Sequence, residues 1–486
     1  MRTHKPDLSL QVSGTWLSPG VVVFGILLAC FIAGFSLIWI PWWVVIGLTI
    51  MGVFAAICVR WPYAGLLIYL CMEYLRPTER YPVLSPLHLT RIVAVFVLIG
   101  WLVRRRRDGF ELWVRAPENV AVIGMLAVIM LSIPFAYWKA RAFDTSIDFV
   151  RTTIIFILIS NIINTTKRLK GYIITFIILN VLLSAEQLFN YVAHGPTPEG
   201  LLRVGSASGS FLGEDGDFAL AMGVALPYVY FLAWSNIKPV LRALSAAAGT
   251  MFVGSIVATG SRGGALGLVA VLFTLAVRSR SRRTAFALIG LILLFAWVMA
   301  PPAYKARVAT ITESHSQDLT AQSRLASWRA ARQMFKDHPV LGVGAGNFLV
   351  AFIGRYGGSW SWSRTTHNVF YQAASELGIC GLIVFFFLLA CVLFRSVKLN
   401  YRLIRVGLGG SPMAAYVAAL LPSTIAFLVS GSFQTPLYYP HIYYIAALAL
   451  ALNNIATPML VERERKEIQP EWKPRQIRRR FSTVSK

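Results

Sequence analysis

Residues 369–394 read VFYQAASELGICGLIVFFFLLACVLF, a long apolar run in which Glu376 is the one charged side chain. A helix needs about 20 mostly apolar residues to cross the hydrocarbon core of a bilayer. Comparable blocks recur along the whole chain, separated by short breaks rich in basic residues, proline or glycine. The pattern predicts an all-α fold, a polytopic integral membrane bundle of about 12 to 14 spans.

The composition agrees with a membrane protein. Of 486 residues, 56% are hydrophobic and 14% are charged, and the mean hydropathy is +0.62. Soluble domains carry about 25% charged residues. These values exclude a soluble enzyme, a secreted disulfide scaffold and a disordered chain.

Fourteen segments are predicted to span, of which 62–75, 89–103 and 264–277 are short. The complete set is 21–39, 42–59, 62–75, 89–103, 117–135, 147–163, 171–193, 218–234, 243–259, 264–277, 284–300, 369–394, 412–430 and 441–457.

The net charge of +25 is concentrated in short runs between these blocks, such as Arg104–Arg107 and Arg278–Arg283. Lys and Arg mark cytoplasmic loops by the positive-inside rule. Alternating fourteen spans from a cytoplasmic N-terminus places every basic run on one side, so both termini are predicted to be cytoplasmic. No basic recognition helix with aromatic platforms occurs, which argues against nucleic acid as a partner.

Two long segments, 194–217 and 301–368, then fall on the outer side, where long ordered loops often carry function. In the second, apolar residues recur at helical spacing and predict an amphipathic helix against the bundle: Leu325, Trp328, Ala331 and Phe335. Asp318 or Thr320 is expected to cap this helix, and Pro339 follows its end.

Four polar motifs on the outer side compete for the active site. They are LRVGS at 202–206 with FLGEDGD at 211–217, TGSRGG at 259–264, SRLASW at 323–328 with DHP at 337–339 and GVGAGN at 342–347, and HN at 367–368 with ELG at 376–378.

Arg262 is the most informative of these residues. Inserting an arginine at the centre of a membrane span costs about 2.5 to 3.5 kcal/mol. We therefore expect Arg262 to have a buried partner or an anionic ligand that offsets this cost. The alternative is a side chain that snorkels to the interface. Arg203 and Arg324 share its predicted side, and three converging guanidinium groups suit a diphosphate. Taken one at a time, Arg203 and Arg324 read as solvated loop residues.

His367 lies where the long loop re-enters the membrane, and an imidazole suits a general base near neutral pH. A lone histidine at a helix start is more often structural. The glycines of 342–346 lack the lysine of a phosphate-binding loop and follow no strand, so a nucleotide site is rejected. Glu214, Asp215 and Asp217 are expected to pair with arginines rather than to bind a metal, and no cofactor is predicted.

Taken together, the motifs resemble the bacterial O-antigen ligase and polymerase superfamily. The resemblance covers about residues 170–455 and rests on three runs: Arg203-Val-Gly before the acidic stretch, Ser261-Arg262-Gly263-Gly264, and His367-Asn368 followed by Gly378-x-x-Gly381. The run from Arg324 to Phe348 also fits. Where relatives often have Pro-Asn, this chain has Gly216-Asp217. Trp61-Pro62-Tyr63 and Glu73-Tyr-Leu-Arg76-Pro77 are most similar to the exosortase-associated O-glycosylation ligases.

The resemblance implies a metal-independent, inverting glycosyltransferase in the bacterial inner membrane with its site facing the periplasm. Its donor would be an undecaprenyl-diphosphate-linked glycan, and its acceptor a hydroxyl of a lipid, a protein or a growing polysaccharide. Arg203, Arg262 and Arg324 would bind the diphosphate and His367 would deprotonate the acceptor. The supporting residues would be Ser261, Gly263, Asn368 and Asp217.

The same resemblance divides the chain into an N-terminal transmembrane module (1–165), a ligase-like core (166–460, including the periplasmic loop 301–368 with its short helices) and a basic cytoplasmic tail (461–486). A transporter of an anionic or lipid-linked substrate is the alternative, and it predicts alternating access. A third possibility is that the protein is a structural assembly partner without catalytic activity. In that case we expect the arginines to be scattered and not gathered at one site.

Overall fold

The computed structural model is all-helical. It describes residues 42–81, 88–107, 116–194, 212–235, 238–279, 281–299, 319–358 and 365–468, and these contain no β-strand. The first half comprises α2 (Trp42–Arg60), α3 (Pro62–Leu75), α4 (Pro77–Arg80), α5 (Leu89–Arg107), α6 (Pro117–Ser132), η2 (Ile133–Phe135), α7 (Lys139–Ile162), α8 (Thr166–His194) and α9 (Asp215–Ser235). The second half comprises α10 (Pro239–Ala258), α11 (Arg262–Arg278), α12 (Arg282–Met299), α14 (Leu319–Asp337), α15 (Phe348–Ala351), η3 (Phe352–Tyr356), α16 (Val369–Arg405), α17 (Pro412–Gly431) and α18 (Pro440–Ile468).

Seven of these helices are long and apolar enough to cross a membrane, namely α6 with η2, α8, α9, α10, α16, α17 and α18. The chain is therefore a multi-pass membrane protein. Other predicted spans are also helical, but α3 and α11 have only 14 and 17 residues, below the usual length of a span. The first predicted span, 21–39, lies outside the described residues.

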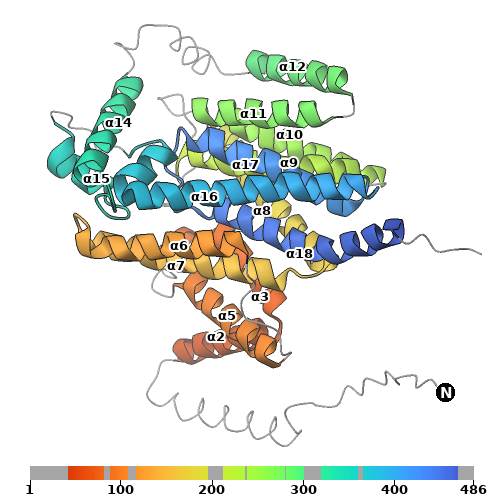
Figure 1. Ribbon diagram of the computed structural model, residues 1–486, viewed down its shortest axis with the longest axis horizontal. Helices are drawn as coiled ribbons and strands as arrows, with labels where there is room; N and C mark the ends of the chain where they lie inside the picture. The colour runs from red at the N-terminus through yellow and green to blue at the C-terminus, as the bar shows by residue number, and fades with distance from the viewer. Residues whose placement is uncertain are drawn as a thin grey trace, which may run out of the picture.

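The centre of the bundle is built around α9, which packs against α10, α11 and α17 (Figure 1). Small residues allow this close packing, as is common between membrane helices. A side chain at Gly264 would collide with Ala219 of α9, and one at Gly267 would collide with Ser430 of α17. Gly264 of the TGSRGG motif and Gly267 beyond it therefore let the start of α11 pack against two neighbouring helices.

The N-terminal helices α2, α3 and α5 pack together at the lower edge of Figure 1. They join the rest of the bundle where α3 packs on α8 and where α5 and α3 pack on α7. Beyond them, α6 packs on α16 and α7 on α18. Arg395 donates two hydrogen bonds to the fully buried Glu118 carboxylate and so joins α16 to the start of α6. The predicted N-terminal module and core thus share a packed interface.

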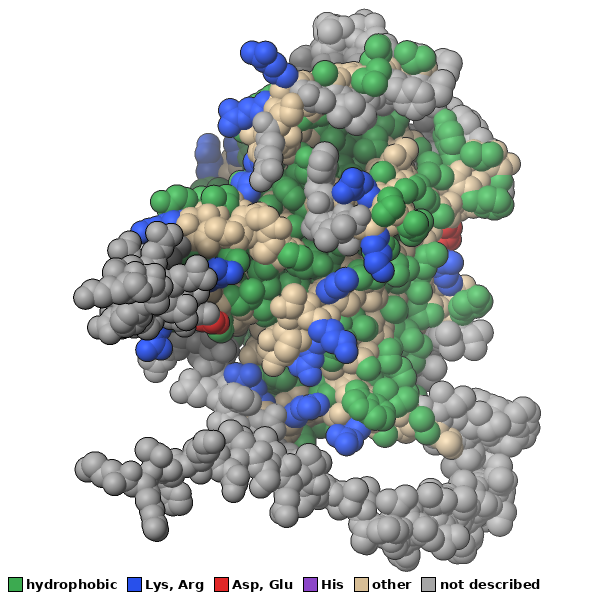
Figure 2. All heavy atoms as spheres, turned by 90° about the vertical axis from the view of Figure 1, so that its right-hand side faces the viewer, with side chains coloured by type: hydrophobic (Ala, Val, Ile, Leu, Met, Phe, Trp, Pro, Cys, Tyr) green, Lys and Arg blue, Asp and Glu red, His purple; other side chains and the backbone are tan. Residues whose placement is uncertain are grey.

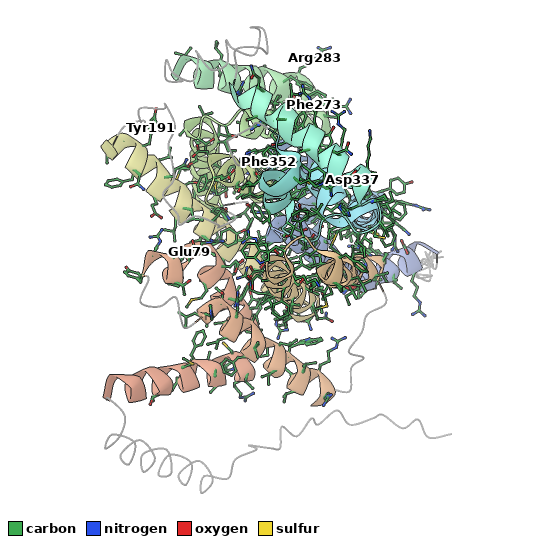
Figure 3. All side chains as sticks on the ribbon, turned by 90° about the vertical axis from the view of Figure 1, so that its left-hand side faces the viewer. Glu79, Tyr191, Phe273, Arg283, Asp337 and Phe352 are labelled. Carbon is green, nitrogen blue, oxygen red and sulfur yellow. The ribbon has the colours of Figure 1, made fainter. Side chains whose placement is uncertain are left out.

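The amphipathic helix predicted within 301–368 is α14, which packs on α16. It forms a small core with the segment that follows, and Figure 3 shows Asp337 and Phe352 side by side on this body. The Tyr356 hydroxyl donates to Asp337 Oδ2 at 2.9 Å, and this hydrogen bond lowers the Asp337 pKa. The contacts with this following segment therefore stabilise α14 on the surface of the bundle.

The predicted cap of α14 was Asp318 or Thr320. Thr320 lies inside the helix, whereas Asp318 lies outside the described residues, so capping by Asp318 stays a prediction. Leu325, assigned to the apolar face, is exposed, because the buried face is made of smaller side chains. These are Ser323, Ser327, Ala330, Ala331 and Met334.

Lys and Arg side chains gather on the end of the bundle that lies at the right of Figure 1, where few acidic side chains are visible (Figure 2). The C-terminal ends of α5 and α16 and the first turn of α8 supply arginines, among them Arg104, Arg402 and Arg168. One end of the helical bundle is therefore strongly basic.

Candidate active site

Arg262 is the first residue of α11, directly after a break in the chain. The preceding helix α10 ends at Ala258, and Gly260 takes the positive φ of 61° that lets the chain turn. Ser261 caps α11, because its hydroxyl accepts a hydrogen bond from the Gly264 amide at 3.1 Å. The guanidinium is therefore carried at a helix end, where the positive pole of the helix favours an anion.

His367 immediately precedes α16. Its φ of 42° lies in the left-handed region, which costs a residue with a side chain about 1 to 2 kcal/mol. Asn368 caps the helix by accepting from the Phe370 and Tyr371 amides at 2.9 and 3.1 Å. A strained backbone of this kind persists only where neighbours fix it, and such positions cluster at functional sites.

The histidine ring is 15% exposed, and its Nδ1 lies 4.0 Å from Oε2 of Glu214, which is 56% exposed. Glu214 was expected to pair with an arginine. Nδ1 of His367 therefore faces the Glu214 carboxylate, and Nε2 is the ring nitrogen that points away from it. This arrangement suits a base whose imidazolium form needs a nearby negative charge.

Arg324 lies on α14, with its Cζ 6.0 Å from the centre of the Phe433 ring. One turn later, the Trp328 indole donates from Nε1 to the Thr366 carbonyl at 2.9 Å. The Trp328 ring also stacks on Tyr371, with centroids 5.5 Å apart. Because Thr366 is fully buried and adjoins the histidine, this contact fixes α14 to the start of α16.

Phe433 connects these parts. A side chain at Gly263 would place its Cβ 2.5 Å from the Phe433 Cβ, so the start of α11 contacts the same residue that Arg324 covers. The neighbouring Ser432 carbonyl accepts from Asn368 Nδ2 at 3.0 Å. The chain neighbours of Arg262 and His367, namely Gly263 and Asn368, therefore contact the same short segment that Arg324 covers.

We call residues 432–439, between α17 and α18, the central connection. Its Gln434 occupies the space in which Gly216 has no side chain, and Tyr438 donates to Glu376 Oε2 at 2.7 Å. Sequence reasoning missed this segment, which contains none of the four motifs. Its sequence SFQTPLYY, polar and aromatic between two apolar spans and followed by Pro440, is the signal that could have found it.

Asp217 lies in the first turn of α9 and is 1% exposed. Its Oδ2 accepts a hydrogen bond from the Tyr439 hydroxyl at 2.9 Å. Burial and the nearby carboxylate raise the pKa of Tyr439 well above its ordinary value, so this hydroxyl stays protonated and donates. Asp217 therefore fixes the central connection to α9, and no arginine among the described residues is recorded as its ion-pair partner.

The glycine run 342–346 is a docking loop for α16. The Gly346 and Phe348 amides donate to the Glu376 carboxylate at 3.0 and 3.2 Å. The loop amides thus bind a carboxylate of the protein itself. Gly378, with φ of 62°, kinks α16 so that Ile379 can donate to the Pro339 carbonyl at 2.8 Å.

Arg203 lies outside the described residues, so its predicted place beside the other arginines stays a prediction. Within the described ranges, no group of three or more His, Cys, Asp or Glu side chains is placed to hold a metal ion. Of the seven other predicted site residues, four contact the central connection, namely Arg324, Gly263, Asn368 and Asp217. The other three, Ser261, Arg262 and His367, adjoin two of these in the chain.

Comparison with known proteins gives a family for part of the chain. Residues 246–386 match the family model described as O-antigen ligase, and no curated protein matches the chain. The matched segment includes Arg262, Arg324 and His367, while Asp217 precedes it. This multi-pass membrane protein therefore carries an O-antigen ligase family domain.

Proposed function

We propose that the protein transfers a glycan from a lipid diphosphate to a hydroxyl acceptor at the site around the central connection. The O-antigen ligase family implies a lipid-linked glycan as the substrate. The observation that supports the proposal is that Arg324, Gly263 and Asn368 all contact residues 432 and 433, since the last two adjoin Arg262 and His367 in the chain. We infer that the donor glycan is linked to undecaprenyl diphosphate and that Arg203 is the third arginine that binds the diphosphate.

Arg262 and Arg324 bind the diphosphate in this mechanism. Guanidinium groups bind phosphate oxygens in a bidentate manner, and they neutralise the charge that grows on the leaving group. Ser261 orients the first by capping α11, and Gly263 allows α11 to reach Phe433. The lipid tail would lie among the apolar side chains around the bundle.

His367 takes the acceptor proton on Nε2. The acceptor oxygen forms a bond to the anomeric carbon as the bond from that carbon to the diphosphate oxygen breaks, and the bonding electrons leave with the lipid diphosphate. Attack opposite the leaving group inverts the anomeric centre. Glu214, 4.0 Å from Nδ1, stabilises the imidazolium ion that results. Each step uses groups of the protein and its substrates, so we expect the reaction to proceed without a metal.

The basic end of the bundle supports an orientation. By the positive-inside rule this end faces the cytoplasm, with both termini there, and the candidate site faces the periplasm of a bacterial inner membrane. The acceptor is a lipid, protein or glycan hydroxyl. We also propose that the chain divides at residue 165 into an N-terminal transmembrane module and a ligase-like core. The protein is then of the exosortase-associated O-glycosylation ligase type.

The test is release of undecaprenyl diphosphate from an undecaprenyl-diphosphate-linked oligosaccharide in detergent, with EDTA present and each acceptor supplied in turn. Wild type should release the product only when an acceptor is present. Arg262→Ala, Arg324→Ala and His367→Ala should each lose at least about a hundredfold in rate. Arg332→Ala is the matched control for Arg324→Ala, because Arg332 is an exposed residue of the same helix.

Release that is equal in wild type and in all three variants would refute the assignment of the site. Binding of the lipid with no release for any acceptor would instead favour a transporter.

A further inference from the structure

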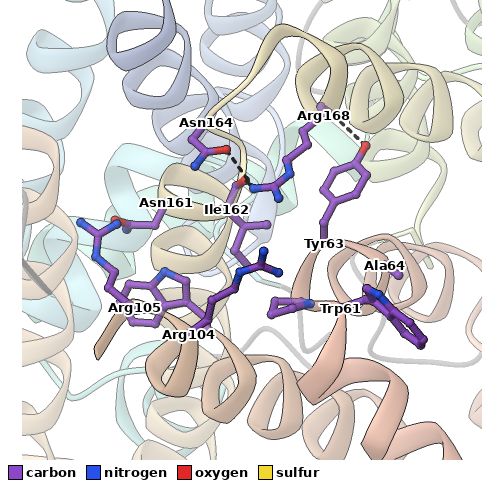
Figure 4. A pocket seen from close by; sticks show the side chains of 11 residues that line it. Trp61, Tyr63, Ala64, Arg104, Arg105, Asn161, Ile162, Asn164 and Arg168 are labelled. Carbon is purple, nitrogen blue, oxygen red and sulfur yellow. Dashed lines mark hydrogen bonds between the residues drawn. The ribbon is translucent and has the colours of Figure 1, made fainter. Parts of the chain in front are cut away.

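A pocket of about 340 Å³ lies outside the candidate active site, between the starts of α3 and α8 and the ends of α5 and α7 (Figure 4). It shares no residue with the site around the central connection. Its described lining includes three guanidinium groups and no carboxylate. The lining residues are Trp61, Pro62, Tyr63, Ala64, Trp101, Arg104, Arg105, Asn161, Ile162, Asn164 and Arg168.

Arg168 is held in a fixed position by neutral groups. It donates to the Ile162 carbonyl at 3.0 Å and to Asn164 Oδ1 at 2.9 Å. Its Cζ lies 5.8 Å from the centre of the Tyr63 ring, and the Tyr63 hydroxyl donates to the Arg168 carbonyl at 2.8 Å. These contacts orient the guanidinium and leave its positive charge available to an anion.

Arg104 and Arg105 extend from the last turn of α5 on the opposite wall (Figure 4). Arg105 lies with its Cζ 5.8 Å from the centre of the buried Trp101 ring. The start of α3 adds to this positive field, because its N-cap residue Trp61 makes no side-chain capping hydrogen bond. Guanidinium groups and a helix N-terminus together favour the oxygens of a phosphate.

Asn161 adds a neutral polar side chain to the lining. Its Nδ2 donates to the Ile157 carbonyl at 2.8 Å, and its Oδ1 is buried. The lining therefore combines positive charge with neutral polar groups, which suits a phosphate ester.

The position of the pocket favours a lipid over an ion from solution. It adjoins the first turn of α8, a membrane-spanning helix, and so lies at the level of the lipid head groups. Trp61 is 56% exposed with the Arg60 Cζ 6.0 Å from its ring centre, as is typical of aromatic side chains at the membrane interface. We propose that this pocket binds the phosphate diester of an anionic phospholipid such as phosphatidylglycerol.

The experiment titrates the purified full-length protein in detergent with phosphatidylglycerol, phosphatidylcholine and inorganic phosphate, and counts bound molecules by native mass spectrometry. Wild type should retain one phosphatidylglycerol in preference to phosphatidylcholine. Arg105→Gln should weaken that binding about tenfold. Arg106→Gln is the matched control, because Arg106 is exposed in the same run and does not line the pocket, and it should change affinity less than about twofold.

Arg104→Gln, an exposed side chain at the pocket mouth, serves as a second variant should Arg105→Gln fold poorly, and it should also weaken binding. An equal loss in Arg105→Gln and Arg106→Gln would show a diffuse basic surface and overturn the proposal. Equal affinity for phosphatidylcholine would do the same. Inorganic phosphate that binds as tightly as the lipid and displaces it would overturn the assignment to a lipid.

Discussion

Gly263→Ala tests whether the start of α11 and Phe433 together shape the active site. The added Cβ would lie 2.5 Å from the Phe433 Cβ, about 1 Å closer than an ordinary contact between carbon atoms. Phe433 must therefore shift, and it carries the Arg324 guanidinium above its ring. The change disturbs two predicted diphosphate ligands without removing either of them.

The free energy of unfolding should change little. Alanine in place of glycine favours a helix by up to about 1 kcal/mol, while overpacking costs about 1 to 3 kcal/mol. The net loss of stability is then about 0 to 2 kcal/mol. A displacement of about 1 Å of a group that positions substrate costs about a hundredfold in rate, so we expect activity to fall far more than stability.

The assay compares acceptor-dependent release of lipid diphosphate and the midpoint of thermal unfolding for wild type, Gly263→Ala and Gly254→Ala. Gly254 of α10 is the matched control, because a Cβ there would have no heavy atom within 4 Å. This control should keep full activity. Wild-type activity in Gly263→Ala would refute the reasoning, and so would an equal loss in Gly254→Ala.

Three further changes have defined outcomes. Glu214→Gln should lower kcat about fivefold with little change in KM for the lipid donor, because a half-exposed carboxylate at 4.0 Å contributes about 1 kcal/mol to the imidazolium ion, and an unchanged kcat would refute this role. Trp328→Phe should lower the free energy of unfolding by about 1 to 3 kcal/mol in chemical denaturation, because the buried Thr366 carbonyl loses its donor; no change would refute the contact. Gly378→Ala should destabilise by several kcal/mol more than Gly407→Ala in the same assay, because both have positive φ but only the former would place a Cβ 2.5 Å from backbone atoms; equal losses would refute the docking of the glycine run.

Much of the fold was predictable because a membrane imposes long apolar helices. The run 369–394 became the first part of α16, and the breaks around Arg262 and His367 fell between helices as predicted. The exact number of spans was harder to predict. Short helices such as α3 satisfy their backbone hydrogen bonds as any helix does, and neither length nor hydropathy fixes their depth in the membrane.

The contacts inside the site could not be predicted. Sequence spacing marks residues near a helix start, but it does not show which distant segment packs against them. Phe433 and the rest of the central connection lie far along the chain from Gly263 and carry no catalytic residue type. The role of Asp217 depends likewise on Tyr439, and only the structure reveals that the central connection reaches the first turn of α9.

The glycine run shows a different limit. Its lack of a phosphate-loop lysine argued against a nucleotide site, but nothing in its spacing indicated the Glu376 carboxylate that its amides bind. Similarly, the apolar spacing of α14 predicted the helix but not its buried face. Small serines and alanines pack against the bundle there, so Leu325 lies outward.

The central claim is that Arg262 and Arg324 bind one diphosphate. A double-mutant cycle tests it most directly, with the affinity for undecaprenyl diphosphate measured for wild type, Arg262→Ala, Arg324→Ala and the double variant. Residues that share a ligand should show a coupling energy of at least about 1 kcal/mol, with the double variant hardly weaker than either single one. Losses that add within about 0.5 kcal/mol would contradict the claim, because two independent sites behave in that way.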